Sequence, residues 1–175
     1  IDYGLDRLAC LWIALSPEGC AYVYREYCES NLPIGKAAEA ILSRTPASEE
    51  IYATLAPPDL FSRSQETGKS KAVLFSSFGV TFTKTSNNRE SGWLAVKELL
   101  AEKNGKVGLK IFSFCTELIR CLPALQIDRQ KPSDCANEPH EITHAPDALR
   151  GFAVFHTRPA APERSGARSV WTPDM

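Results

Sequence analysis

The sequence lacks the features of a membrane-spanning or disulfide-stapled protein. Its longest apolar stretch, Leu8–Leu15, is too short for a bilayer span of roughly 20 residues. Asp2 and Asp6 stand where a signal peptide would carry basic residues. None of the six cysteines belongs to a Cys-x-x-Cys pair, so the sequence predicts reduced thiols rather than disulfides or a thiolate zinc site.

The sequence also lacks an excess of charge of either sign. The net charge is -1 over 175 residues, of which 43% are apolar, as expected for one globular domain with its own core. Dedicated nucleic-acid binders usually carry a large positive excess, but an enzyme with a metal-holding carboxylate cluster can bind DNA through a local basic rim. Charge therefore neither supports nor excludes DNA binding. Because the chain begins at Ile1, inside an expected strand, we interpret it as a fragment of a longer polypeptide.

Apolar periodicity and turn signals predict an α/β protein with a mixed central sheet flanked by helices. An initial antiparallel meander is followed by alternating helices and strands. Strands are expected at 2–15, 21–27, 51–55, 80–85 and 109–114, and helices at 33–42, 70–78, 89–102, 116–122 and 144–156. Residues 1–157 are expected to form one domain, and the polar segment 158–175 a flexible tail.

Three aspartates fall where such a sheet exposes side chains. Asp2 lies in the first strand, Asp59 follows the strand that ends at Leu55, and Asp147 lies one turn into the last helix, for which Thr143 is the expected N-cap. If the three carboxylates converge, their oxygens favour Mg²⁺ or Mn²⁺, and two such ions can act on a phosphodiester. The alternative is that they are ordinary turn, strand-end and cap residues.

Three motifs in order along the chain carry a family resemblance. They are Ile1-Asp2-Tyr3-Gly4, Ala56-Pro57-Pro58-Asp59 and His144-Ala145-Pro146-Asp147-Ala148-Leu149-Arg150. From Ile1 to about Phe155 the chain resembles the C-terminal nuclease domain of phage terminase large subunits, and the last motif is similar to the family signature His-x-x-Asp-Ala-x-Arg. The resemblance implies an RNase H-like fold in which Asp2, Asp59 and Asp147 hold two Mg²⁺ or Mn²⁺ ions and concatemeric duplex DNA is cut.

The resemblance also implies a setting and further site residues. Its partners would be double-stranded DNA, an upstream ATPase domain of the same polypeptide, the portal protein and the small terminase subunit, in the host cytoplasm and without a membrane. His144 is a candidate auxiliary residue. The family often has an acid before this histidine, where this chain has Thr143, so Asp134 and Asp128 are candidates for a fourth ligand.

Basic residues near the second acid are candidates for DNA phosphate contacts, although a solvated polar loop explains them equally well. They are Arg63, Lys69 and Lys71 in the loop 62–71, together with Lys84 and Arg89. Gly68-Lys69-Ser70 resembles the end of a phosphate-binding loop, but the earlier glycine of that motif is absent. No nucleotide is therefore expected in this domain.

The main rival motif is His140-Glu141-Ile142-Thr143-His144, which matches the zinc-metallopeptidase signature. Pro146 opposes it, because the helix that carries such a site would have to continue through that position. A structural zinc site at Cys135, His140 and His144 is a second alternative. Further alternatives on the same fold are a junction resolvase, an RNase H enzyme and a non-catalytic DNA-binding domain. The non-catalytic domain would require loss of the three acids, all of which are present here.

Overall fold

The computed structural model describes residues 1–4 and 6–157, and the expected tail at 158–175 lies outside them. Its larger sheet has the order β1-β2-β3-β6. The strands are β1 (Asp2–Tyr3), β2 (Arg7–Leu15), β3 (Ala21–Ser30) and β6 (Leu109–Ile111). The first three form an antiparallel meander, and β6 pairs in parallel with β3. The mixed sheet that the sequence predicts is confirmed.

A second, two-stranded parallel ladder continues this sheet. It pairs β4 (Leu55–Ala56) with β5 (Thr83–Lys84). The backbone nitrogen of Ile1 donates a hydrogen bond to the carbonyl oxygen of Leu55 at 2.7 Å. Because this bond places β4 beside β1, the strands follow one another across the molecule as β6-β3-β2-β1-β4-β5.

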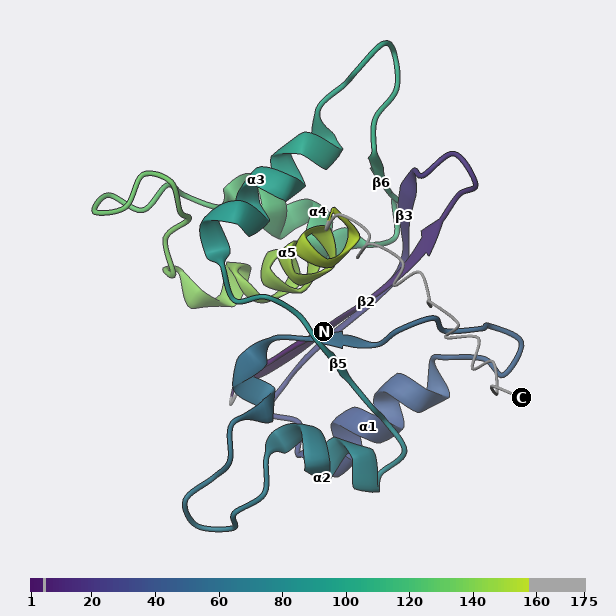
Figure 1. Ribbon diagram of the computed structural model, residues 1–175, viewed down its shortest axis with the longest axis vertical. Coiled ribbons are helices and arrows are strands. Elements are labelled where there is room, and N and C mark those ends of the chain that lie inside the picture. The colour runs from purple at the N-terminus through teal and green to yellow at the C-terminus, as the bar shows by residue number, and fades with distance from the viewer. Residues whose placement is uncertain (5, 158–175) are drawn as a thin grey trace, which may run out of the picture.

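Helices cover both faces of the sheet (Figure 1). One layer contains α1 (Ile34–Ser43) and α2 (Lys71–Ser77), and the other contains α3 (Arg89–Leu100), α4 (Thr116–Cys121) and α5 (His144–His156). Short 3₁₀ turns occur at η1 (Pro58–Phe61), η2 (Leu122–Ala124) and η3 (His140–Ile142). Within the described residues, no helix is both long enough and apolar enough to cross a bilayer.

The long apolar run of β2 follows from this three-layer arrangement. Leu8, Cys10 and Trp12 pack into the core on the α1 and α2 side, whereas Ala9 packs into the core on the α3 and α5 side. Successive side chains of a strand point to opposite faces of the sheet, so a strand must be apolar on both faces when helices cover both faces.

All six cysteines of the chain are free of disulfides.

Local capping fixes where two of the helices begin. The Ser70 hydroxyl accepts a hydrogen bond from the backbone N–H of Val73 at 3.2 Å, and the Asn88 side chain accepts one from the N–H of Ser91 at 3.0 Å. Each satisfies a donor that has no partner within its own helix. The expected starts at residues 70 and 89 therefore agree with the structure to within one residue.

Several details of the sequence prediction were wrong. The strands expected at 51–55, 80–85 and 109–114 form ladders of only two or three residues. Leu42 and Leu100, which the helical spacing groups with the apolar residues of α1 and α3, have 46% and 42% of their surface exposed. Thr143 does not cap α5 with its side chain, because its hydroxyl donates to the carbonyl oxygen of His140 and its backbone is already helical.

Candidate functional site

The turn after β1 brings two aspartates onto one histidine. Asp2 lies in β1 and Asp6 precedes β2, and the N–H of Gly4 donates to the carbonyl oxygen of Arg7 at 2.9 Å to close the turn. A Cβ atom on Gly4 would lie 2.7 Å from Oδ1 of Asp6 and 3.4 Å from Cε1 of His144. Glycine at this position therefore leaves room for Asp6 and His144 to approach the backbone.

His144, the first residue of α5, bridges these two carboxylates and is only 4% exposed. Its Nδ1 lies 2.8 Å from Oδ2 of Asp2, and its Nε2 lies 3.1 Å from Oδ2 of Asp6. The hydrogen bond with Asp2 raises the pKa of His144, and this outweighs the partial desolvation that would lower it. The imidazole thus ties the start of the sheet to the start of the last helix.

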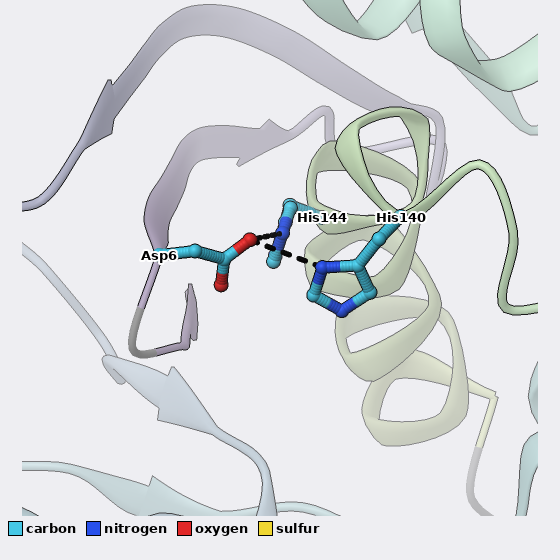
Figure 2. A group of neighbouring side chains, drawn as sticks. All are labelled: Asp6, His140 and His144. Carbon is cyan, nitrogen blue, oxygen red and sulfur yellow. Dashed lines mark hydrogen bonds and ion pairs between the residues drawn. The ribbon is translucent and has the colours of Figure 1, made fainter.

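His140 completes a cluster of two histidines and one carboxylate (Figure 2). Its Nδ1 lies 3.0 Å from the same Oδ2 of Asp6, and its ring centroid lies 4.6 Å from that of His144. One ligand atom from each of the three residues lies within 4.8 Å of the others. Among the described residues, neither Glu141 nor Cys135 belongs to this group.

The two histidines do not lie on one continuous helix. The turn η3 ends at Ile142, and α5 begins at His144. The peptidase signature needs both histidines on one helix face with its glutamate beside them, and Glu141 is exposed. The conflict with Pro146 that the sequence indicated is resolved because Pro146 lies in the first turn of α5, where an N–H would have no partner in the helix.

A small pocket lies where β4 and β5 end, and two of the three predicted acids line it. Asp2 and Asp147 contribute to its wall, together with Thr85 and Ser86, which directly follow β5. This is the edge at which open α/β sheets bind ligands. The cavity volume is about 10 Å³, which is about the space that one water-sized occupant needs. Residues 2 and 147 therefore line the same small pocket, but within residues 1–4 and 6–157 the three predicted acids do not form a group close enough to share one ion.

Two arginines hold Asp147 in place. Its Oδ1 accepts hydrogen bonds from Nε of Arg150 at 2.7 Å and from Nη1 of Arg89 at 3.2 Å. Nε of Arg89 also donates to both oxygens of Asp134, at 3.0 and 3.1 Å, and the indole of Trp93 donates to Oδ1 of the same carboxylate. Arg89 is therefore engaged between two acids rather than extended toward solvent.

The surroundings of Asp134 differ from those of an open metal ligand. Partial burial acts to raise the pKa of Asp134, but the backbone N–H of Cys135 and the guanidinium of Arg89 outweigh burial and lower it. Asp128, the other candidate for a fourth ligand, accepts hydrogen bonds from the backbone N–H groups of Gln130 and Lys131 in its own turn. In the part of the chain that the structure describes, neither of these two candidates contacts His144, whereas Asp6 does, through Oδ2 at 3.1 Å from Nε2 of the histidine.

Arg150 is a buried residue of the pocket wall, and one of its guanidinium nitrogens has no hydrogen-bond partner among the described residues. It is 6% exposed, and its Nη1 has no hydrogen-bond partner within residues 1–4 and 6–157. Gly92 on α3 makes room for its stem, because a Cβ atom there would lie 2.6 Å from Cγ of Arg150. Buried donors are rarely left without a partner. Arg150 therefore lines the pocket with one guanidinium N–H group unpaired among the described residues.

Asp59 lies in η1, directly beyond the pocket wall formed by Pro57. Its side chain is exposed and is not part of the pocket lining, whereas its neighbour Leu60 is fully buried and anchors the turn to the core. The assignment of Asp59 as a third ligand stays a prediction.

The basic residues around the second acid have different environments. Arg63 and Lys69 are exposed in the loop before α2, which an isolated bridge between Arg63 and Ser70 closes. The ammonium groups of Lys71 and Lys84 lie 5.5 and 5.3 Å from the ring centroids of Tyr3 and Phe61. Their contact with DNA stays a prediction.

Comparison with known proteins supports the fold. No family model and no curated protein matches the sequence. Among solved structures, the chain is similar to the P22 large terminase nuclease domain, with a TM-score of 0.64 and 16% identity over 88% of this chain and 77% of that one. The chain therefore shares the fold of that domain. The RNase H-like class that the sequence predicts is therefore confirmed.

Two residues at or beside this pocket were missing from the sequence prediction. Asp6 was overlooked because it lies in a turn, outside the family motifs and the apolar periodicity of the strands. Only the folded turn at Gly4 brings its carboxylate to His144. Arg150 was quoted as part of a motif but given no role. Its spacing of three residues from Asp147 on an expected helix could have identified the pair, since such residues are neighbours on a helix surface.

Proposed function

We propose that the chain is the nuclease domain of a viral DNA-packaging terminase and cleaves concatemeric double-stranded DNA with the help of divalent cations. The observation that carries this proposal is that Asp2 and Asp147 both line one small pocket at the ends of β4 and β5. The likeness to the P22 large terminase nuclease domain supports the choice of this activity among those that an α/β fold can host.

The donor set at this pocket fits Mg²⁺ or Mn²⁺. Carboxylates and hydroxyls are the ligands that these hard cations prefer, and Asp2, Asp147, Thr85 and Ser86 supply them. Asp2 and Asp147, with Asp59 as the third acid, would hold two ions. Bound there, such ions would activate water and stabilise the leaving oxygen in phosphodiester hydrolysis.

The protein's own residues would orient the carboxylates and the substrate. Arg150 and Arg89 fix the carboxylate of Asp147, and His144 fixes that of Asp2. These contacts keep both acids in one geometry before DNA arrives. Arg150 lines the pocket, and its Nη1, which has no partner among the described residues, would donate to a phosphate oxygen that enters there, since a guanidinium forms strong hydrogen bonds with phosphate. Arg63, Lys69, Lys71 and Lys84 would contact the DNA backbone farther out.

The partners in this proposal are those of a packaging motor. They are double-stranded DNA, an ATPase domain upstream in the same polypeptide, the portal protein and the small terminase subunit, in the host cytoplasm. No nucleotide is assigned to this domain.

Digestion of a supercoiled plasmid tests the activity and its metal dependence. We expect nicked and linear products with Mn²⁺ or Mg²⁺, and none with EDTA, because the acids need cations to act on a phosphodiester. A plasmid left intact in both metals, alongside cleavage of a four-way junction or an RNA–DNA hybrid, would identify a resolvase or RNase H specialist instead. Hydrolysis of casein with Zn²⁺ would point to the peptidase.

A further inference from the structure

We propose that Asp6, His140 and His144 form a binding site for a transition-metal cation such as Zn²⁺, separate from the carboxylate pocket for Mg²⁺ or Mn²⁺. The three side chains come from the turn after β1, from η3 and from the start of α5, and they point toward one another (Figure 2). The proposal does not rest on the nuclease assignment, because its measure is metal binding alone.

Two of the three distances between ligand atoms in the cluster are close to those of a zinc site, and the third, between the two histidines, is no more than 4.8 Å. In tetrahedral coordination with bonds of about 2.0 Å, neighbouring ligand atoms lie about 3.3 Å apart. Oδ2 of Asp6 lies 3.0 Å from Nδ1 of His140 and 3.1 Å from Nε2 of His144. A cation can therefore enter with shifts of a few tenths of an ångström at these two ligand pairs. It would replace a proton shared between Asp6 and the imidazoles, since metal-ligating histidines are neutral.

The ligand chemistry separates this cluster from the pocket lined by Asp2 and Asp147. Imidazole nitrogens suit Zn²⁺, Co²⁺ and Ni²⁺, whereas Mg²⁺ prefers oxygen ligands and keeps much of its water. Two imidazoles and one carboxylate also form the three-ligand set of open zinc sites, which leave a position for water. Asp6 and His140 have 53% and 54% of their side-chain surface exposed, so a cation can reach them from solvent.

The second ring nitrogen of His144 is already positioned for this role. Nδ1 is paired with the Asp2 carboxylate at 2.8 Å, which leaves Nε2 facing Asp6. Metal-ligating histidines nearly always make such a contact from the nitrogen that does not bind the metal, because it fixes the tautomer and the ring orientation. Burial of His144 adds to this rigidity.

Calorimetric titration of the chelator-treated full chain with Zn²⁺, in a reducing buffer with and without excess Mg²⁺, tests the site. The variants are Asp6→Asn and His140→Gln, which change exposed side chains, with His156→Gln as the matched histidine control, since that ring stacks on Phe152. We expect one Zn²⁺ per chain in the unmodified protein and in His156→Gln, undisturbed by Mg²⁺. Both cluster variants should bind Zn²⁺ at least about tenfold more weakly.

Three results would overturn the proposal. The first is unchanged Zn²⁺ affinity in both cluster variants, which would place the ion elsewhere, for example on a cysteine thiol. The second is displacement of Zn²⁺ by millimolar Mg²⁺, and the third is its loss in Asp147→Asn with retention in His140→Gln. Either of the last two would assign the ion to the carboxylate pocket. Melting curves for every variant confirm that the proteins compared are folded. Plasmid cleavage is scored separately, so failure of this site leaves the nuclease assignment intact.

Discussion

Replacing Asp147 by asparagine is expected to lower metal-dependent DNA cleavage by roughly 10²- to 10³-fold. Loss of the carboxylate removes a cation ligand, and a bound cation stabilises transition-state charge by several kcal/mol, where each 1.36 kcal/mol corresponds to a factor of ten. Asparagine keeps an oxygen that can accept from Arg150, so the helix and pocket should remain in place. The measurement is the initial rate of plasmid nicking in Mn²⁺.

A matched control separates this effect from a general loss of surface charge. Glu98 lies on α3 and is exposed, and its carboxylate pairs with Lys103 outside the pocket. Glu98→Gln should cleave DNA at the rate of the unmodified protein. If Asp147→Asn kept its melting temperature and cut DNA within about threefold of the unmodified rate, Asp147 would not be a metal ligand. A loss of about threefold corresponds to well under 1.36 kcal/mol of transition-state stabilisation, far less than loss of a cation ligand should cost.

The second large effect is expected at Arg89. Its guanidinium joins Asp134 and Asp147, with side chains only 10% and 14% exposed, and also donates to the carbonyl oxygen of Cys135. Replacement by glutamine leaves two partly buried carboxylates with fewer donors. Hydrogen bonds to charged groups contribute about 1.5–3 kcal/mol, so Arg89→Gln should lower the free energy of unfolding by about 2–3 kcal/mol. Urea unfolding measures the change.

Two further variants show whether geometry or charge is responsible. Arg89→Lys keeps the charge but cannot reproduce the planar fork that serves both acids, so it should recover only part of the lost stability. Arg63→Gln, in an exposed loop, should change stability by less than about 0.5 kcal/mol. Unchanged stability of Arg89→Gln together with weaker DNA binding would show that Arg89 serves the phosphate backbone.

Much of the fold could be predicted because burial leaves a periodic trace in the sequence. The apolar residues of β2 alternate between two cores, and the spacing of Trp93, Val96 and Leu99 marks the buried face of α3. Strands β4 and β5 were expected to be longer, because an apolar segment such as 51–55 does not reveal how many of its residues pair. Pairing depends on the neighbouring strand, which sequence periodicity does not show.

The site was only partly predictable for a related reason. Asp2 and Asp147 were singled out by motifs that resemble those of the terminase family, and both line the pocket at the ends of β4 and β5, while their role as metal ligands stays a prediction. The contacts between side chains were less visible. Neither the partnership of Arg89 with Asp147 nor that of Asp6 with His144 leaves a pattern, because each joins residues more than 50 positions apart.

Gathering of acidic side chains from distant parts of the chain into one site for hard cations can be seen in an anomalous difference map from a crystal soaked in Mn²⁺. We expect a Mn²⁺ peak between the carboxylates of Asp2 and Asp147, with a second ion beside Asp59. A pocket that stays free of Mn²⁺ at saturating concentration, with Asp59 turned away from Asp2 and Asp147, would contradict this expectation.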